Sequence, residues 1–161
     1  KDFYDKNAEV HFIGHLQTNK VKYIIDSVSM IQSVDSIKLA EEIDRHAGRI
    51  GKCQDILIEV NIGGEKSKSG IAASGLEELV YQVSELENIR VRGLMAIPPA
   101  GSSERFLFDM QKLYIDISQK KIHNISMDYL SMGMSGDYEA AIKYGANMVR
   151  IGRGLFGPRN Y

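Results

Sequence analysis

LSMGMSGDYEAAI (residues 130–142) and VRIGRGLFG (residues 149–157) are the stretches that decide the fold. Each begins as an apolar run typical of a strand and ends in a glycine-rich turn, and the first continues into a helical pattern. In (β/α) barrels, the loops after the last two strands commonly form a phosphate site. Glycine lets the backbone approach a ligand, and successive N–H groups can point at an anion. The two stretches therefore favour a barrel with an anion site.

Four further apolar, β-branched runs precede these units and alternate with helical patterns. The predicted strands are 10–13, 30–34, 56–60, 91–97, 129–132 and 148–151, and the clearest helices are 38–46, 75–86 and the region 106–117. Ser74 and Glu77 predict a capping box at the start of the second of these helices. Repeated strand–helix units require parallel pairing through right-handed crossovers, so the fold class is α/β.

Two α/β architectures compete at this point. Six predicted strands in 161 residues fall short of the eight strands and about 250 residues of a complete barrel, so the strand count alone favours an open doubly wound sheet. The two glycine-rich stretches favour a TIM-type (β/α) barrel truncated to about its last six βα units. No linker or low-complexity tract divides the chain, so we expect a single domain over residues 1–161.

The composition excludes several classes of partner. The chain has a net charge of −1 and 43% hydrophobic residues, so no basic field would concentrate nucleic acid or an anionic membrane surface. No apolar run approaches the roughly 20 residues that span a bilayer. Cys53 is the single cysteine, which fits a reducing cytoplasm. His11 and His15 lack a third ligand, so no metal site is predicted.

Ser135 and Arg150 are the side chains that best fit a binding site. Ser135 follows a strand and can cap the next helix, where its hydroxyl would help to bind an anion. Alternatively, Ser135 is a simple helix cap and the glycines only form tight turns. Arg150 lies in an apolar strand, where a cation is costly unless it is paired. It either bonds a neighbouring carboxylate at the exposed strand end or reaches a ring nitrogen or acid group of a ligand.

Other residues have simpler interpretations. Met95, Met132 and Met134 are expected to fill the core. The polar loop 61–70 contains Lys66 and Lys68, which either are solvated or lend positive charge to the mouth of a site.

Several stretches together resemble the YggS/PROSC family of pyridoxal phosphate homeostasis proteins, which is also called the alanine-racemase N-terminal-domain-like family. The matching stretches are HFIGHLQTNK (11–20), SVD (33–35), VNIGGEKSKSGI (60–71), RGLMAIPP (92–99), LSMGMSGDYEAAI (130–142) and VRIGRGLFGPRNY (149–161). They occur in order along the whole chain. The resemblance is therefore more specific than any single short motif.

This resemblance implies a (β/α) barrel with pyridoxal 5'-phosphate at its C-terminal mouth. Ser135 and the backbone of Gly152 and Arg153 would hold the phosphate, and Arg150 would face the pyridine nitrogen. Met134 and Lys68 would also lie beside the cofactor. A cation at the ring nitrogen disfavours its protonation and weakens the cofactor as an electron sink. That arrangement suits a carrier or a racemase better than an aminotransferase.

The family carries its Schiff-base lysine on the first barrel strand, upstream of the segments matched here. We therefore expect this chain to begin at the third strand and to lack the covalent anchor, a role that Lys66 and Lys68 do not take. The resemblance implies a cytoplasmic pyridoxal phosphate homeostasis protein without catalytic turnover or catalytic residues, with pyridoxal-phosphate-dependent apoenzymes as recipients.

Two other functions stay open. One is a pyridoxal-phosphate-dependent amino-acid racemase, which needs acid and base groups on both faces of the α-carbon. That family takes one of them from a C-terminal domain, which we expect to be missing after Tyr161. The other is a barrel enzyme acting on a phosphorylated metabolite, which would share the phosphate loops only.

Overall fold

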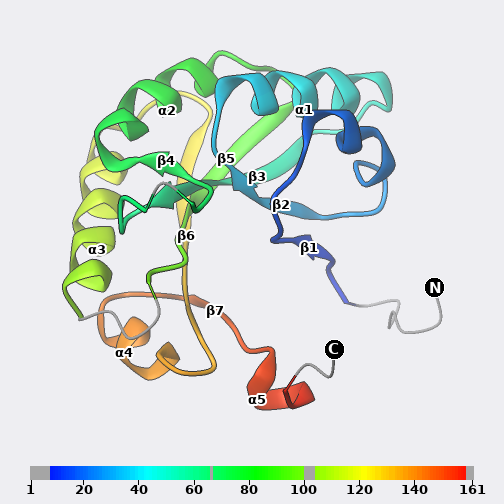
Figure 1. Cartoon of the computed structure of the whole chain (residues 1–161). Helices are drawn as coiled ribbons and strands as arrows, with labels where there is room; N and C mark the ends of the chain where they lie inside the picture. Colours follow the sequence, from blue (N-terminus) through cyan, green and yellow to red (C-terminus); the bar gives the residue numbers. More distant parts are fainter. Residues whose placement is uncertain (1–7, 66, 100–103, 159–161) are drawn as a thin grey trace.

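A parallel sheet curves into half of a (β/α) barrel in the computed structural model, which describes residues 8–65, 67–99 and 104–158. The strand order is β1-β2-β3-β5-β6-β7, and the short strand β4 pairs with β3 at the side. The helices α1, α2 and α3 lie along the convex side, while β1 and β7 lie at the two ends of the open curve (Figure 1). Because a doubly wound sheet carries helices on both faces, the barrel prediction is confirmed.

The observed elements agree closely with the predicted ones. The strands are β1 (His11–Phe12), β2 (Met30–Val34), β3 (Gln54–Asn61), β4 (Ile71–Ala72), β5 (Ile89–Met95), β6 (Ile125–Met134) and β7 (Met148–Arg150). The helices are α1 (Ile37–Arg49), α2 (Leu76–Ser84), α3 (Glu104–Gln119), α4 (Tyr138–Lys143) and α5 (Arg153–Phe156), with 3-10 turns η1 (Thr18–Tyr23) and η2 (Ala73–Gly75). All six predicted strands are present, and β4 is an addition. Within the described residues, none of the helices has the length and apolarity to cross a membrane.

The two faces of the sheet pack differently. The outer face forms the main core with the helices, through residues such as Ile56, Ile58 and Leu130 against Ile43 and Leu107. The inner face carries a smaller apolar cluster made by Met30, Leu57 and Met95. Strand residues point alternately to the two sides, so the polar side chains that share the inner face with this small cluster point toward the barrel interior.

A bulge at Gly93 adjusts this alternation in β5. The pairing of β5 with β6 shifts register between Val91 and Gly93. Val91 and Leu94 both pack in the outer core, whereas Met95 belongs to the inner cluster. Gly93 has a φ of +147°, and a Cβ atom there would lie 1.9 Å from the carbonyl oxygen of Tyr129. Only glycine fits this position.

The predicted capping box at α2 is wrong. Ser74 lies inside the turn η2, Gly75 occupies the N-cap, and the start of α2 has no side-chain cap hydrogen bond. The extra 3-10 turn shifts the helix start past the position from which the Ser74 hydroxyl could reach the first N–H groups of α2.

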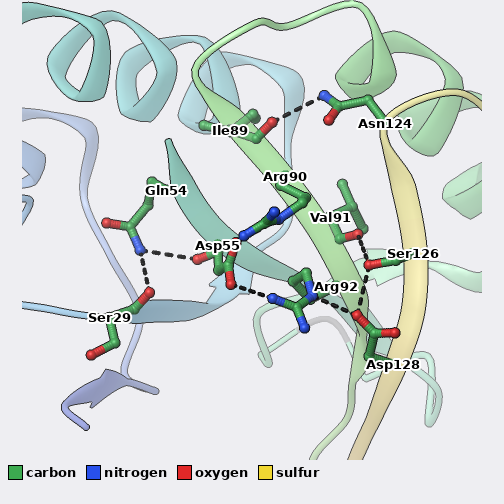
Figure 2. Close-up of polar contacts among 10 residues, drawn as sticks. All are labelled: Ser29, Gln54, Asp55, Ile89, Arg90, Val91, Arg92, Asn124, Ser126 and Asp128. Carbon is green, nitrogen blue, oxygen red and sulfur yellow. Dashed lines mark hydrogen bonds and ion pairs between the residues drawn. The ribbon is translucent and has the colours of Figure 1, made fainter. Parts of the chain in front are cut away.

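A charged network ties the strands together nearer their N-terminal ends, away from the glycine-rich turns (Figure 2). Arg92 donates to Asp55 (2.6 Å) and to Asp128 (2.5 Å), and Arg90 pairs with Asp55 at 2.8 Å. Ser126 and Arg92 hold the pKa of the Asp128 carboxyl below its usual value by hydrogen bonding to the ionised form. The charges of this network satisfy one another, so it links β3, β5 and β6 and does not resemble a binding site.

Candidate functional site

The C-terminal strand ends bring polar side chains to one level of the inner face. In the register of the sheet, Glu59 lies opposite Met95, Met95 opposite Ser131, Ser131 opposite Met148, and Met134 opposite Arg150. Ligands of parallel α/β sheets bind at this edge.

The two glycine-rich turns meet through Ser135. The N–H group of Gly154 donates to the Ser135 hydroxyl oxygen at 3.0 Å. The Ser135 hydroxyl donates to no acceptor among the residues that the structure describes, so its one proton is available to an anion. The prediction that Ser135 caps the following helix is wrong, since α4 begins at Tyr138 after the N-cap residue Asp137. The hydroxyl instead bridges the loops after β6 and β7.

The turn after β7 has room for a ligand. No heavy atom lies within 4 Å of the position that a Cβ atom would take on Gly152. Among the described residues, the N–H groups of Gly152 and Arg153 donate to no acceptor. These groups, together with the free proton of Ser135, fit a phosphate or a similar anion.

Arg150 points back across the inner face from β7. Its Nη1 donates to the Ser131 hydroxyl at 2.6 Å, and its Nη2 donates to the carbonyl oxygen of Ala96 at 2.9 Å. Within the part of the chain that the structure describes, no carboxylate forms an ion pair with it, so the carboxylate alternative is wrong. A guanidinium has five N–H donors, and three of them are left for a ligand.

The electrostatic setting of Arg150 is that of a partly buried cation with neutral partners. Burial lowers the pKa of the guanidinium, and the charges of Asp137 and Glu59 only partly offset this effect. Arginine nevertheless stays protonated at neutral pH. A positive charge in such surroundings is stabilised when a ligand supplies an acceptor or an anion.

An open cleft of about 590 Å³ lies at the C-terminal end of β3. It is lined by His15, Glu59, Val60, Asn61, Ser67, Lys68, Ser69 and Ile97. Glu59 is buried and accepts a hydrogen bond from the Ser69 hydroxyl at 2.7 Å. Burial raises the pKa of the Glu59 carboxyl, against the opposing effect of the Ser69 hydrogen bond. The cleft adjoins the surroundings of Arg150, because Ile97 lines it and the neighbouring Ala96 carbonyl accepts a hydrogen bond from Arg150.

The remaining predicted residues have mixed outcomes. Lys68 lines the cleft and forms an ion pair with Glu65 at 2.8 Å, while Lys66 lies outside the described residues. Arg153 is exposed at the start of α5. Met95 and Met132 are fully buried as predicted, but Met134 is 37% exposed, so its interpretation as core filler is wrong. β6 runs on to Met134, which is its last residue and lies at the site edge.

Sequence reasoning missed three polar residues of the inner face, namely Gln32, Glu59 and Ser131. All three are less than 5% exposed. Each interrupts an apolar strand, in MIQSV, ILIEV and YLSM respectively. That is the signal that identified Arg150, and the same test applied to every polar residue within an apolar strand would have found these three.

The structure contains no metal-binding cluster among residues 8–65, 67–99 and 104–158, where no three His, Cys, Asp or Glu side chains converge.

Comparison with known proteins identifies relatives over nearly the whole chain. Residues 4–160 match the family described as alanine racemase, N-terminal domain. A protein of Aquifex aeolicus named pyridoxal phosphate homeostasis protein is 44% identical over 161 residues, covering 98% of this chain and 70% of that protein.

Two solved structures have the same fold. A structure described as an unknown protein from Bifidobacterium adolescentis is 37% identical with a TM-score of 0.88, and the match covers 92% of this chain and 60% of that one. PipY of Synechococcus elongatus, with pyridoxal phosphate bound, is 32% identical with a TM-score of 0.83, and the match covers 91% of this chain and 69% of that one. The chain thus spans between about three fifths and seven tenths of the length of these relatives.

Proposed function

This chain belongs to the alanine racemase N-terminal domain family, and from that premise we propose that it binds pyridoxal 5'-phosphate in intracellular cofactor homeostasis, without catalytic turnover of its own. The names of its relatives support this proposal: the Aquifex protein is a pyridoxal phosphate homeostasis protein, and PipY has been solved with the cofactor bound. The observation that carries the proposal is the hydrogen bond from Gly154 to Ser135, which joins the two predicted phosphate loops.

The phosphate is assigned to the two joined loops. The Ser135 hydroxyl, held by Gly154, donates its proton to one phosphate oxygen, and the N–H groups of Gly152 and Arg153 donate to others. Arg153 adds a positive charge nearby. Hydrogen bonds from neutral donors to a charged acceptor contribute about 1.5–3 kcal/mol each. Several of them therefore contribute substantially to the affinity for the phosphate group.

The pyridine ring is assigned to the inner face beside Arg150. A guanidinium can only donate, so the ring nitrogen must accept and is held unprotonated. Bound pyridoxal phosphate supplies a reactive aldehyde, and an unprotonated ring withdraws electrons from it less strongly. Arg150 thereby suits a carrier or a racemase better than an aminotransferase. Met134 and Lys68 complete the proposed surroundings.

A racemase remains the second candidate because the family carries the name of that enzyme. Racemisation requires exchange of the α-hydrogen of an amino acid. The full chain, supplied with pyridoxal phosphate and L-alanine in D₂O, is expected to leave the α-hydrogen unexchanged by ¹H NMR. Steady exchange would replace the homeostasis proposal with the enzymatic one.

Binding is tested by comparing three ligands on the full chain by isothermal titration calorimetry. We expect pyridoxal phosphate to bind at least about tenfold more tightly than pyridoxal, because pyridoxal cannot accept the charge-assisted hydrogen bonds that the phosphate receives. Inorganic phosphate should compete with pyridoxal phosphate. Equal affinity for pyridoxal and pyridoxal phosphate would refute the assignment of the loops.

The recipients are proposed to be pyridoxal-phosphate-dependent apoenzymes, and the location to be the cytoplasm, where a single cysteine is unexceptional. An apoenzyme mixed with the loaded chain should regain activity faster than with the same concentration of free cofactor. Reactivation at the rate of the free cofactor in the same solution would contradict transfer.

A further inference from the structure

A chain of hydrogen bonds crosses the interior of the half-barrel and ends at Arg150. Ser131 on β6 donates to the Gln32 side-chain oxygen at 2.7 Å. The Gln32 side-chain nitrogen lies 3.0 Å from His11 Nδ1 and 3.1 Å from the sulfur of Met148. Since β3 and β5 separate β2 from β6 in the sheet, Gln32 bridges the two arms of the curve directly.

Arg150 fixes the direction of donation along this series of hydrogen bonds. Arg150 can only donate, so the Ser131 oxygen must accept from it and the Ser131 proton must go elsewhere. The acceptor is the Gln32 oxygen. The Gln32 amide nitrogen therefore faces the other way and donates to His11 Nδ1 and to Met148. Each group has one orientation that satisfies its neighbours.

From this geometry we infer that Gln32, acting through Ser131, is a positioning residue that aims the Arg150 guanidinium at the ring of the ligand. The inference rests on the proposed function. The Ser131 oxygen and the Ala96 carbonyl fix two N–H groups of the arginine. The Ser131 hydroxyl can keep its lone pairs toward Arg150 because it donates its hydrogen bond to the Gln32 side-chain oxygen. Without Gln32, the Ser131 hydroxyl can rotate, and the arginine loses its fixed acceptor.

Neutral positioning residues also preserve the charge of the arginine. A carboxylate at position 131 would form an ion pair with Arg150 and leave the guanidinium less need of an acceptor from a ligand. Gln32 and Ser131 are both buried and are uncharged, so they orient the guanidinium without neutralising it. The ring nitrogen of the ligand then becomes its strongest available acceptor.

The test compares pyridoxal phosphate with its carbocyclic analogue, in which C–H replaces the ring nitrogen. Both ligands carry the same phosphate, so the ratio of their dissociation constants reports only the interaction at the ring. In Gln32→Leu, loss of the hydrogen bond to Ser131 should reduce the preference for pyridoxal phosphate by about 3- to 10-fold, the equivalent of one neutral hydrogen bond. Affinity for the analogue should stay unchanged.

Gln54→Leu is the matched control. Gln54 is also a buried glutamine, and its amide donates to the carbonyl oxygens of Ser29 and Asp55 near the N-terminal ends of the strands, as Figure 2 shows. This variant loses comparable hydrogen bonds away from Arg150. It should lower the melting temperature without changing the ratio of dissociation constants.

Further variants separate the possible failures. Ser131→Ala should reproduce the effect of Gln32→Leu, and the double variant should add little to either, because both act through one path. Ser131→Ala also decides the question if Gln32→Leu does not fold. An unchanged ratio in a folded Gln32→Leu or Ser131→Ala variant, with a reduced ratio in Arg150→Met, overturns the inference alone. An unchanged ratio in Arg150→Met overturns the proposed ring assignment itself.

Discussion

Replacing Gly152 with valine separates binding from folding more clearly than any other change at this site. Gly152 has a φ of −100°, which residues other than glycine can adopt, and its Cβ position has no heavy atom within 4 Å. The free energy of unfolding should therefore change by no more than about 0.5 kcal/mol, as is usual for surface substitutions.

The effect on binding should be much larger. The isopropyl group would fill the open space beside the N–H groups of Gly152 and Arg153, where the phosphate is proposed to lie. Loss of one charge-assisted hydrogen bond, at about 1.5–3 kcal/mol, corresponds to roughly a 10- to 150-fold rise in the dissociation constant for pyridoxal phosphate. Affinity for pyridoxal, which lacks the phosphate, should hardly change.

Calorimetric titration and thermal unfolding of the same samples measure the two effects. Gly14→Val is the matched control, since Gly14 is exposed in the loop after β1 and its Cβ would lie at an ordinary 3.8 Å from the Phe12 ring. We expect that control to bind pyridoxal phosphate like the unaltered chain. Unaltered affinity in Gly152→Val would refute the reasoning, as would a loss of affinity shared equally by pyridoxal.

Three further predictions concern stability. Glu59→Gln keeps the hydrogen bond from Ser69 but removes a carboxyl whose pKa is raised chiefly by burial. In the parent, the folded chain binds the proton of this carboxyl more tightly than the unfolded chain does. The stability of the parent therefore falls as pH rises through the carboxyl range. Melting curves from pH 4 to 8 should show the variant gaining on the parent as pH rises, and a constant difference would contradict this sign. Arg92→Met should lower the free energy of unfolding, measured in urea, by about 1–3 kcal/mol. The reason is that Asp128 loses its cation while Asp55 keeps Arg90. The affinity of the folded variant for pyridoxal phosphate should stay unchanged. Gly93→Ala should cost at least about 2 kcal/mol, since its methyl group would collide with the Tyr129 carbonyl oxygen; a melting temperature within 2 °C or so of the parent's would show that β5 relaxes more easily than its backbone implies.

The strand pattern was predictable because parallel strands are apolar along nearly their whole length. β2 was located to the residue, and the helix predicted over 38–46 lies within α1. The barrel itself depended on the glycine-rich turns, because strand number alone favours an open sheet. Local signals failed where tertiary structure decided: an extra 3-10 turn displaced the start of α2, and the loop after β7 captured the Ser135 hydroxyl that the sequence assigned to α4.

The site was predictable only in part. Arg150 and Ser135 stand out because a cation within an apolar strand and a hydroxyl in the glycine-rich turn after a strand are local signals. Gln32 and Ser131 lie 99 positions apart, and no local pattern shows that their side chains meet. Glu59 was missed for a related reason, since its burial depends on the loop that brings Ser69 over it.

The contact between Gln32 and Ser131 also bears on how the chain acquires its native state. Bringing together groups separated by 99 positions has a loop-closure entropy cost. Such a contact forms slowly compared with helices and neighbouring strand pairs. During synthesis the β2 arm leaves the ribosome long before β6 and β7 exist. We therefore expect Arg150 to gain its fixed orientation late in folding, and we expect the proposed ligand to bind only after the curved sheet is complete.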